Sequence, residues 1–320
     1  MDDIALEYRY QRPKCVKGLS SLDLDGIVSF INEGNAKKIL IFSGAGTSVA
    51  SGIPDFRSPK IGLYSQLKKY NLPRPESIFT RDYFKYHPEP FFSLIKFFLP
   101  GKYKPSPAHF LAKLFENHGI LLRHYSQNID GLDKAAGLSE EHLVEWHGTL
   151  SKATCRKCSK KYTLDDIKPK ILAEAVPRCS CGGVIQPDVM LYGDYNDDDL
   201  YTHLDKDVEQ ADLLFVLGTS LKVEPFPSMI ENVSYSIPRV LINADPVCTY
   251  DEKLDIKDGL VTEVGKEKKF NLFKFGHFFN TRDIFIPGDI QENVIKLIEK
   301  LGWKNEFDEI YNKTLNKYQD

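Results

Sequence analysis

A strand that runs directly into a glycine turn is the feature that most constrains the fold. The apolar run 39–42 leads into Gly44-Ala45-Gly46, within the stretch 43–59, which reads SGAGTSVASGIPDFRSP. Glycines allow positive φ angles and let the backbone come close to a ligand. A strand that ends in a glycine turn is where α/β proteins hold phosphate groups. The sequence therefore predicts a phosphate-binding site at the end of this strand.

The loop behind these glycines carries more than a phosphate site requires. Rigid, charged and aromatic residues follow one another at Pro54, Asp55, Phe56 and Arg57. The third glycine of the dinucleotide fingerprint G-x-G-x-x-G is replaced by Val49, and no acidic residue closes a second strand at the expected distance. An ordinary dehydrogenase is therefore disfavoured. The charged loop also disfavours the alternative that the glycines serve turn geometry alone.

Short apolar runs alternate with helical patterns along the chain. Strands are expected over 38–42, 121–127, 212–217, 239–243 and 283–286, and helices over 22–32, 91–98, 107–117, 290–301 and 304–320. This alternation predicts an α/β fold, a Rossmann-like parallel sheet with helices on both faces. Four strand ends carry small or polar residues, at Ser43, Gln127, Gly218 and Asn243. Because ligands bind outside the carboxyl ends of such strands, we expect these ends to form the wall of one site.

Changes in composition divide the chain into modules. A Rossmann-like domain is expected from 20–60, 107–150 and 187–302, with a helical module at 61–106 and a cysteine-bearing module at 151–186. The last two form a smaller domain. Residues 1–19 are expected to be an N-terminal extension and 303–320 a C-terminal helical tail. Within 246–282 we expect a hairpin that packs on the core, with a partner surface as the alternative, through Phe270, Phe273, Phe275, Phe278 and Phe279.

Composition also restricts partners and location. The 320 residues carry a formal net charge of -3, which is too small for strong steering toward nucleic acid or anionic membranes. The N-terminus has no apolar run like that of a secretory signal, and the longest apolar runs are strand-sized. We therefore expect a soluble intracellular protein that binds neither nucleic acid directly nor a membrane.

Four of the six cysteines gather in two close pairs, C-x2-C and C-x-C, at Cys155, Cys158, Cys179 and Cys181. Four thiolates match the tetrahedral coordination of a structural Zn²⁺, which leaves no position open for catalysis. Four unbound cysteines are the disfavoured alternative. Basic residues surround the first pair, but Tyr162 is the only aromatic residue there. A solvated basic face is therefore favoured over a nucleic-acid-binding zinc ribbon.

A single histidine, His147, lies between the expected ligand wall and the cysteine module and is followed by Gly148. Histidine is the side chain whose unperturbed pKa lies closest to neutral pH, which suits a general base. From the residues alone, a catalytic base and a packed or exposed histidine remain equally open.

Taken together, these segments resemble the sirtuins, a family of NAD-dependent protein lysine deacylases. The matches cover about residues 20–302 and keep their order: the glycine loop, SQNIDGLDKAAGL (126–138), EWHGTL (145–150), the four cysteines, QPDVMLYGD (186–194), GTSLKVEPF (218–226) and LINAD (241–245). Three further segments resemble the class I branch, closest to the mainly cytoplasmic histone- and tubulin-deacetylase type: KYNLPRPESIF (69–79), YFKYHPEPFF (83–92) and LGWKNE (301–306). Trp146 is bulky where the family usually has a small or aliphatic residue.

The resemblance implies an NAD-dependent protein lysine deacetylase. Such an enzyme transfers the acyl group from lysine to ADP-ribose and releases nicotinamide and O-acyl-ADP-ribose. It implies NAD as co-substrate, a structural Zn²⁺, acyl-lysine proteins such as histone or tubulin as substrates, and a cytoplasmic location that leaves a nuclear share open. Two alternatives remain: a protein mono-ADP-ribosyltransferase on the same fold, and a zinc-ribbon binding module with a vestigial nucleotide fold.

The resemblance also implies residue roles. His147 would be the general base, with Asn128 as a second catalytic residue. NAD would contact Gly44, Ala45, Gly46, Thr47, Ser48, Asp55, Phe56, Arg57, Tyr64, Gln127, Asn128, Ile129, Asp130, Gly218, Thr219, Ser220, Asn243, Asp245 and Ile290. The substrate peptide would lie as an added strand along Met190, Tyr192, Gly193, Asp194, Val223, Glu224 and Phe226. The four cysteines would bind zinc.

Overall fold

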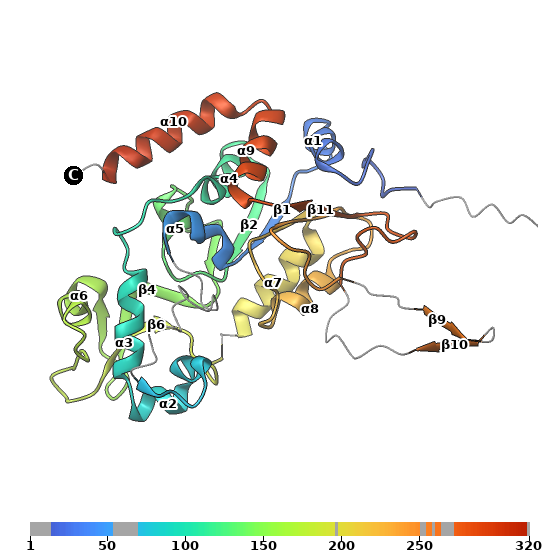
Figure 1. The fold of residues 1–320 in the computed structure, drawn as a ribbon. Helices are drawn as coiled ribbons and strands as arrows, with labels where there is room; N and C mark the ends of the chain where they lie inside the picture. The colour runs from blue at the N-terminus through green and yellow to red at the C-terminus, as the bar shows by residue number, and fades with distance from the viewer. Residues whose placement is uncertain are drawn as a thin grey trace, which may run out of the picture.

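A six-stranded parallel sheet organises the larger part of the molecule (Figure 1). The computed structural model describes residues 14–53, 70–195, 198–249, 254–257, 260–263 and 272–318. The sheet contains β1 (Ile39–Ser43), β2 (Leu121–Ser126), β3 (Leu143–Glu145), β7 (Leu213–Leu217), β8 (Arg239–Asn243) and β11 (Asp283–Pro287). Their order is β11-β8-β7-β1-β2-β3, and every neighbouring pair is parallel. The five predicted strands and the parallel fold are confirmed, whereas β3 was not predicted.

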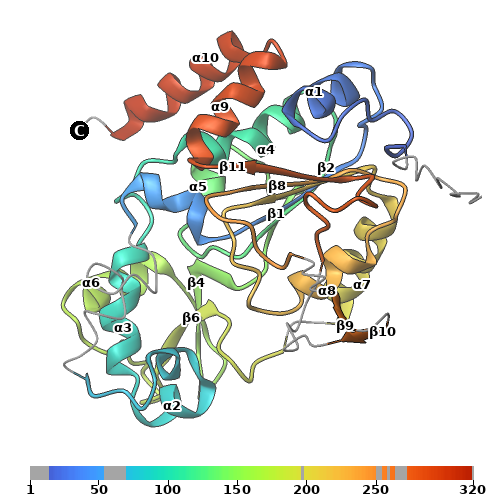
Figure 2. The ribbon, with the colours of Figure 1, turned by 45° about the vertical axis from the view of Figure 1, so that its right-hand side comes forward.

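Helices cover both faces of this sheet (Figure 2). On one face lie α1 (Leu24–Asn32), α4 (Pro107–Asn117), α9 (Ile290–Lys300) and α10 (Lys304–Leu315), whose apolar side chains pack with Ile39 and Ile41 of β1. On the other face, α7 (Asp198–Gln210) and α8 (Phe226–Asn232) pack with Leu40 and Phe42. Successive strand residues point to opposite faces. A strand buried on both faces is therefore apolar throughout, as the run 39–42 is.

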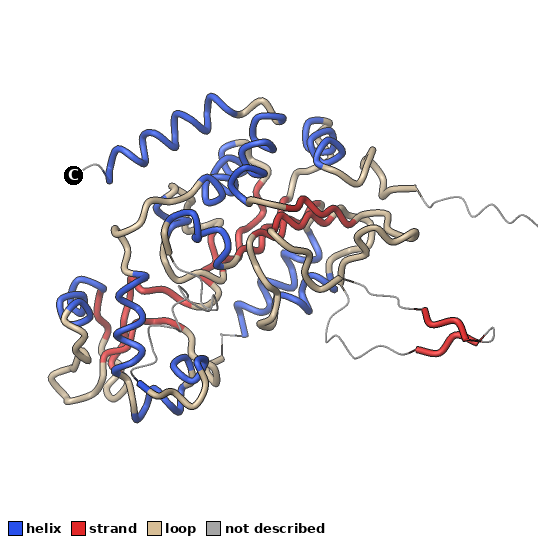
Figure 3. Tube along the Cα trace, viewed as in Figure 1, coloured by secondary structure: helices blue, strands red, loops and turns tan. Residues whose placement is uncertain are grey.

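A smaller lobe is built on a three-stranded antiparallel sheet (Figure 3). Its strands are β4 (Gly148–Cys155), β5 (Lys161–Thr163) and β6 (Ile185–Val189), in the order β5-β4-β6. The helical segments of this lobe are η3 (Pro75–Phe79), α2 (Arg81–Tyr86), α3 (Glu89–Ile95), η4 (Lys96–Phe98) and α6 (Leu164–Leu172). Ile129 and Leu132, from the loop and the short α5 (Leu132–Ala135) after β2, belong to the same apolar cluster as this lobe. The cluster therefore joins the lobe to the parallel sheet.

The strand order reverses direction at β1, which places a ligand crevice there. After β1 the chain adds β2 and β3 on one side, and later β7, β8 and β11 on the other. In open α/β sheets the crevice at such a switch point is the usual ligand site. The turn η1 (Ala45–Ser51) follows β1 directly and occupies this crevice edge, as the sequence predicted.

The C-terminal regions agree with the sequence only in part. Residues 304–318 are helical, as predicted, in α10 and the short η5 (Asn316–Tyr318). The hairpin in 246–282 forms earlier than the phenylalanines, from β9 (Leu254–Lys257) and β10 (Leu260–Glu263). Phe273 is fully buried and stacks on Phe275, whereas Phe278 and Phe279 are exposed. Packing on the core is thus confirmed for Phe273 and Phe275. Phe270 lies outside the described residues.

None of the helices in the described ranges is long and apolar enough to cross a membrane.

Candidate active site

A cavity of about 510 Å³ opens at the carboxyl ends of β1, β2 and β7, beside the smaller lobe. Most of the residues predicted for the site line it. These are Ala45, Gly46, Ser48, Gln127, Asn128, Ile129, Asp130, His147, Met190, Tyr192, Gly193, Asp194, Gly218, Thr219, Ser220, Val223 and Glu224. Segments far apart in the sequence therefore meet around one hollow.

Some predicted residues lie elsewhere. Asn243 and Asp245 follow β8 at the same sheet edge, where the Asn243 side chain donates a hydrogen bond to the Asp245 carbonyl oxygen (2.9 Å). Ile290 is buried at the start of α9 and Phe226 at the start of α8. Neither these four nor Gly44 and Thr47 of the turn are among the residues that line the cavity. Asp55, Phe56, Arg57 and Tyr64 lie outside the described residues.

Other lining residues were not assigned to the site from the sequence. They form apolar and aromatic parts of the wall: Ile53, Phe79, Phe98, Trp146, Val189, Leu191 and Tyr201. Lys222 adds a charged side chain. Trp146, Val189 and Leu191 adjoin predicted site residues, so their positions carried a signal. Phe79, Phe98 and Tyr201 come from elements whose place in space no local motif indicates.

The glycine turn needs its glycines because two backbones touch there. The Gly46 amide donates a hydrogen bond to the Gly218 carbonyl oxygen at 2.7 Å. A Cβ atom on Gly46 would lie 2.7 Å from the same oxygen, closer than real Cβ atoms approach. Gly218 itself has a φ of +58°, and a Cβ there would lie 2.6 Å from the Thr47 amide nitrogen. The loops after β1 and β7 are therefore held in direct contact.

Asn128 links the turn after β2 to the turn after β1. Its side-chain Nδ2, which has two protons to donate, lies within hydrogen-bond distance of three acceptors: the Gly44 carbonyl oxygen (3.2 Å), the Thr47 hydroxyl (3.1 Å) and the Ser48 hydroxyl (3.2 Å). Because three acceptors surround one amide group, the side chain is fixed at the cavity edge.

A buried carboxyl group lies next to Asn128. Asp130 is 5% exposed; it accepts hydrogen bonds from the Ser48 hydroxyl (2.7 Å) and from the Leu132 amide (2.9 Å). Burial raises the pKa of Asp130, while nearby His109 acts in the opposite direction. The Nε2 atom of His109 lies 3.2 Å from the Ser48 hydroxyl.

The two ring nitrogens of His147 have different roles. Nδ1 lies 2.8 Å from the Gln127 carbonyl oxygen, which only accepts hydrogen bonds, so Nδ1 carries the proton. In the neutral ring, Nε2 then has a free lone pair. Burial lowers the pKa of His147 from its ordinary value of 6.5. The ring packs edge-on to Phe226, with ring centroids 6.4 Å apart. The His147 ring is thus oriented and favoured in its neutral form, with Nε2 able to accept a proton.

The segment 190–194 forms the opposite rim and ties the smaller lobe to His147. The Met190 amide donates to the His147 carbonyl oxygen (2.9 Å). Tyr192 pairs with the end of η3, where its amide donates to the Phe79 carbonyl oxygen (2.6 Å). The Asp194 carboxylate accepts from the Leu191 amide (3.1 Å) and lies 3.4 Å from the Arg156 guanidinium. Asp194 therefore shapes the turn of this rim.

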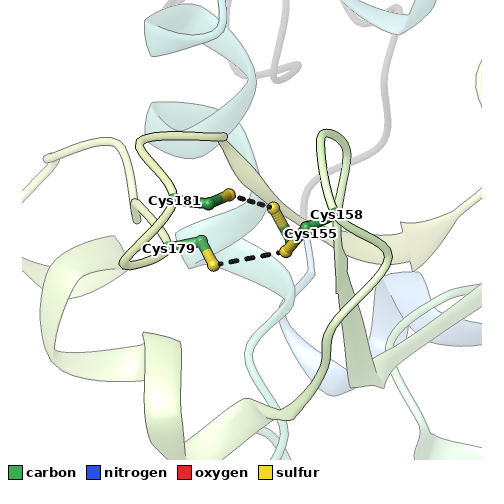
Figure 4. A group of neighbouring side chains, drawn as sticks. All are labelled: Cys155, Cys158, Cys179 and Cys181. Carbon is green, nitrogen blue, oxygen red and sulfur yellow. Dashed lines mark hydrogen bonds between the residues drawn. The ribbon is translucent and has the colours of Figure 1, made fainter.

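The four predicted metal ligands converge in the smaller lobe (Figure 4). Their sulfur atoms all lie within 4.8 Å of one another. Two of the pairs are Cys155 with Cys181 (3.5 Å) and Cys158 with Cys179 (3.6 Å). Tetrahedral zinc with Zn–S bonds of about 2.3 Å requires sulfurs roughly 3.8 Å apart. The donor set therefore fits a structural Zn²⁺ held by these four thiolates.

Neighbouring residues support that cysteine cluster. The Tyr162 hydroxyl donates to the Cys179 sulfur (3.1 Å), and the Lys157 amide donates to the Cys155 sulfur (3.4 Å). A Cβ on Gly183 would lie 2.7 Å from the Cys155 sulfur, so only glycine lets the two turns close. Such hydrogen bonds orient ligands and stabilise thiolate charge.

The fold and the site define a class: Rossmann-like α/β proteins with a cleft at the strand ends and a four-cysteine insertion. The Sir2 family model matches residues 44–225. The chain belongs to the Sir2 family.

Named relatives match over most of the chain. It is 41% identical to "NAD-dependent protein deacetylase sirtuin-2" of Danio rerio, over 92% of this chain and 76% of the relative. It is 40% identical to "NAD-dependent deacetylase sir2A" of Dictyostelium discoideum, over 90% of this chain but 53% of the relative. It is 35% identical to "NAD-dependent protein deacetylase hst2" of Schizosaccharomyces pombe, over 91% of this chain and 80% of the relative.

Proposed function

We propose that this chain is an NAD-dependent protein lysine deacetylase. The observation that carries the proposal is the position of His147, a neutral base with a free Nε2 lone pair, in the same cavity as the glycine turn. The names of the relatives, which describe NAD-dependent deacetylases, support the same activity. We also propose the module boundaries that the sequence predicted, with the helical module at 61–106 and the cysteine-bearing module at 151–186.

The chain's own residues fit this chemistry. NAD, when bound, supplies the ADP-ribose group that accepts the acyl group as nicotinamide leaves. The turn 44–48 would bind the pyrophosphate of NAD. Asn128 and Asp130 would bind the nicotinamide end of NAD beside it. His147 accepts a proton at Nε2 from a ribose hydroxyl. Ile129, Val189 and Leu191 give that part of the cavity an apolar lining, which limits access of water.

The substrates we propose are acyl-lysine proteins such as histone or tubulin. The peptide would pair its backbone between the rim 192–194 and residues 223–224, with the acyl-lysine side chain in the cavity. We propose that the protein is located in the cytoplasm; whether a fraction also enters the nucleus stays open. The zinc would stabilise the smaller lobe and take no part in the reaction.

The His147→Ala variant tests the proposal. We expect deacetylation of an acetyl-lysine peptide to fall at least about 100-fold, because the base is lost. NAD binding, measured by calorimetry, should persist, since the glycine turn remains. His118→Ala is the control, because His118 pairs with Glu306 on α10 and does not line the cavity. Deacetylation by His147→Ala at the wild-type rate would contradict the assignment.

A further inference from the structure

Three buried residues beneath the cavity form a serine–histidine–aspartate arrangement. Ser43 ends β1, His124 lies in β2, and Asp133 lies in α5; they are 1%, 2% and 5% exposed. The Ser43 hydroxyl is 2.7 Å from His124 Nε2, and His124 Nδ1 is 3.8 Å from an Asp133 carboxylate oxygen. None of the three lines the cavity. Substrate cannot reach this hydroxyl, so it is no nucleophile.

The arrangement is connected to the cavity through Ser43. The Ser43 carbonyl oxygen accepts a hydrogen bond from the Gln127 amide (3.0 Å). The Ser43 hydroxyl lies 3.4 Å from the Ser126 hydroxyl, which in turn accepts from the Asn128 amide (3.3 Å). Gln127 and Asn128 both line the cavity. A shift of Ser43 would therefore displace the turn that carries Gln127 and Asn128.

The positions of the protons determine which group donates and which accepts in each contact among Ser43, His124 and Asp133. Ser43 has one hydroxyl proton, and the shorter distance favours donation to His124 Nε2. The ring proton of neutral His124 is then on Nδ1, which faces the Asp133 carboxylate. In the described part of the chain this Nδ1 is buried without a hydrogen-bond partner. Asp133 is thus the group that selects this tautomer, because the opposite tautomer would turn a lone pair toward a carboxylate.

We propose that Ser43, His124 and Asp133 form a buried relay that positions the turn Gln127–Asn128, which makes His124 and Asp133 positioning residues for the reaction at the cavity. The inference rests on the proposed function for its kinetic readout. Burial keeps the His124 ring neutral by lowering its pKa, with Asp133 opposing that shift and His109 adding to it. The relay therefore acts through the tautomer and the hydrogen bonds, and no change of charge is required.

The test compares Asp133→Leu with Asp133→Asn in the full chain. Leucine removes the acceptor that faces His124, whereas asparagine keeps an oxygen there and loses only the charge. We expect Asp133→Leu to raise the KM for NAD about tenfold and leave the KM for the acetyl-lysine peptide unchanged, because a small misplacement of binding groups is costly. Asp133→Asn should stay within about threefold of wild type. Both variants remove the negative charge of Asp133, which acts electrostatically on Asp130. Equal effects of the two variants would therefore be explained by the lost charge and would overturn the relay.

A second comparison separates positioning from stability. Ser43→Ala and His124→Phe each break the relay, so the double variant should be no worse than either single variant in kcat/KM for NAD. Tyr125→Phe is the matched control: it removes a buried hydrogen bond to Asp207 (2.8 Å) from the same strand. It should lower the melting temperature without changing the KM for NAD. If the relay variants also change only the melting temperature, the inference is wrong.

The two proposals can fail separately. If the wild-type chain shows no NAD-dependent deacetylation, the proposed function fails. The calorimetric Kd of NAD for the same variants then still reports on the relay, and an unchanged Kd in Asp133→Leu would overturn it as well.

Discussion

The chemistry attributed to His147 depends on one backbone carbonyl. The Gln127 oxygen accepts the Nδ1 proton, and Gln127 is itself held to β1 through the Ser43 carbonyl oxygen. The base is therefore oriented by the ends of two adjacent strands. A histidine that lacked this acceptor could place its proton on either nitrogen.

The pH dependence of the reaction follows from the burial of His147. Burial lowers the pKa of the ring below 6.5, and the base acts only when neutral. We expect kcat/KM for NAD to rise with pH through an apparent pKa below 6.5 and to be flat between about pH 7 and 8. Initial rates from pH 5 to 8 measure this. An acid limb with its midpoint above 6.5 would contradict the buried, neutral base.

Local motifs account for the residues that the sequence predicted, and distance along the chain explains those that it missed. Gly46, Asn128 and His147 lie in short segments with their own chemical signature. Phe79 and Tyr201 line the same cavity, but they come from η3 and α7, which only tertiary packing brings there. Asp133 is part of a predicted segment, yet its pairing with His124 requires knowledge of how α5 lies on β2.

Among the elements, the central strands of the parallel sheet were predictable because they are buried on both faces. The runs at β1 and β7 are apolar throughout and fully buried. β3 escaped prediction because it has only three residues and is partly exposed. α7 has a mostly polar sequence, and only Leu204, Asp207 and Val208 are buried, so its apolar stripe is narrow.

The smaller lobe should depend on its metal. Cys158→Ser removes one of four ligands, so we expect zinc content to fall from about one per chain to near zero and the melting temperature to fall. Metal analysis of the purified protein and a thermal melt measure both. Cys248→Ser is the control, because Cys248 lies outside the four-cysteine cluster. Retention of a full equivalent of zinc by Cys158→Ser would refute the ligand set.

A buried ion pair lies within the larger lobe, away from the cavity. The Arg239 guanidinium donates to both Asp283 carboxylate oxygens (2.7 and 2.9 Å) and to the Ile230 and Leu272 carbonyl oxygens (3.0 and 2.6 Å). Both side chains are about 3% exposed. The pair thus connects β8 and β11 to α8 through Ile230 and to the backbone of Leu272.

Breaking this pair should destabilise the protein strongly. Asp283→Asn leaves a buried guanidinium without its counter-charge, which typically costs about 3–5 kcal/mol. Urea unfolding measures the change in the free energy of unfolding. Asp25→Asn is the matched control, because Asp25 pairs with Lys300 on the surface, where both side chains are largely exposed; we expect a loss below about 1 kcal/mol. Equal losses in the two variants would contradict the structural role of the buried pair.

At this scale the cavity exists because two lobes meet over the switch point of the sheet. The glycine turn alone indicated a phosphate site, and its missing third glycine disfavoured an ordinary dehydrogenase. The structure adds the second wall, which comes from the smaller lobe and brings the 190–194 rim opposite His147. We propose that NAD is consumed in this cavity while the substrate peptide is bound along the 190–194 rim.

The most direct test of that claim is nicotinamide release from NAD, measured with and without an acetyl-lysine peptide. The account predicts one nicotinamide released for each lysine deacetylated, and almost none when the peptide is absent. Release at the same rate without the peptide would contradict it.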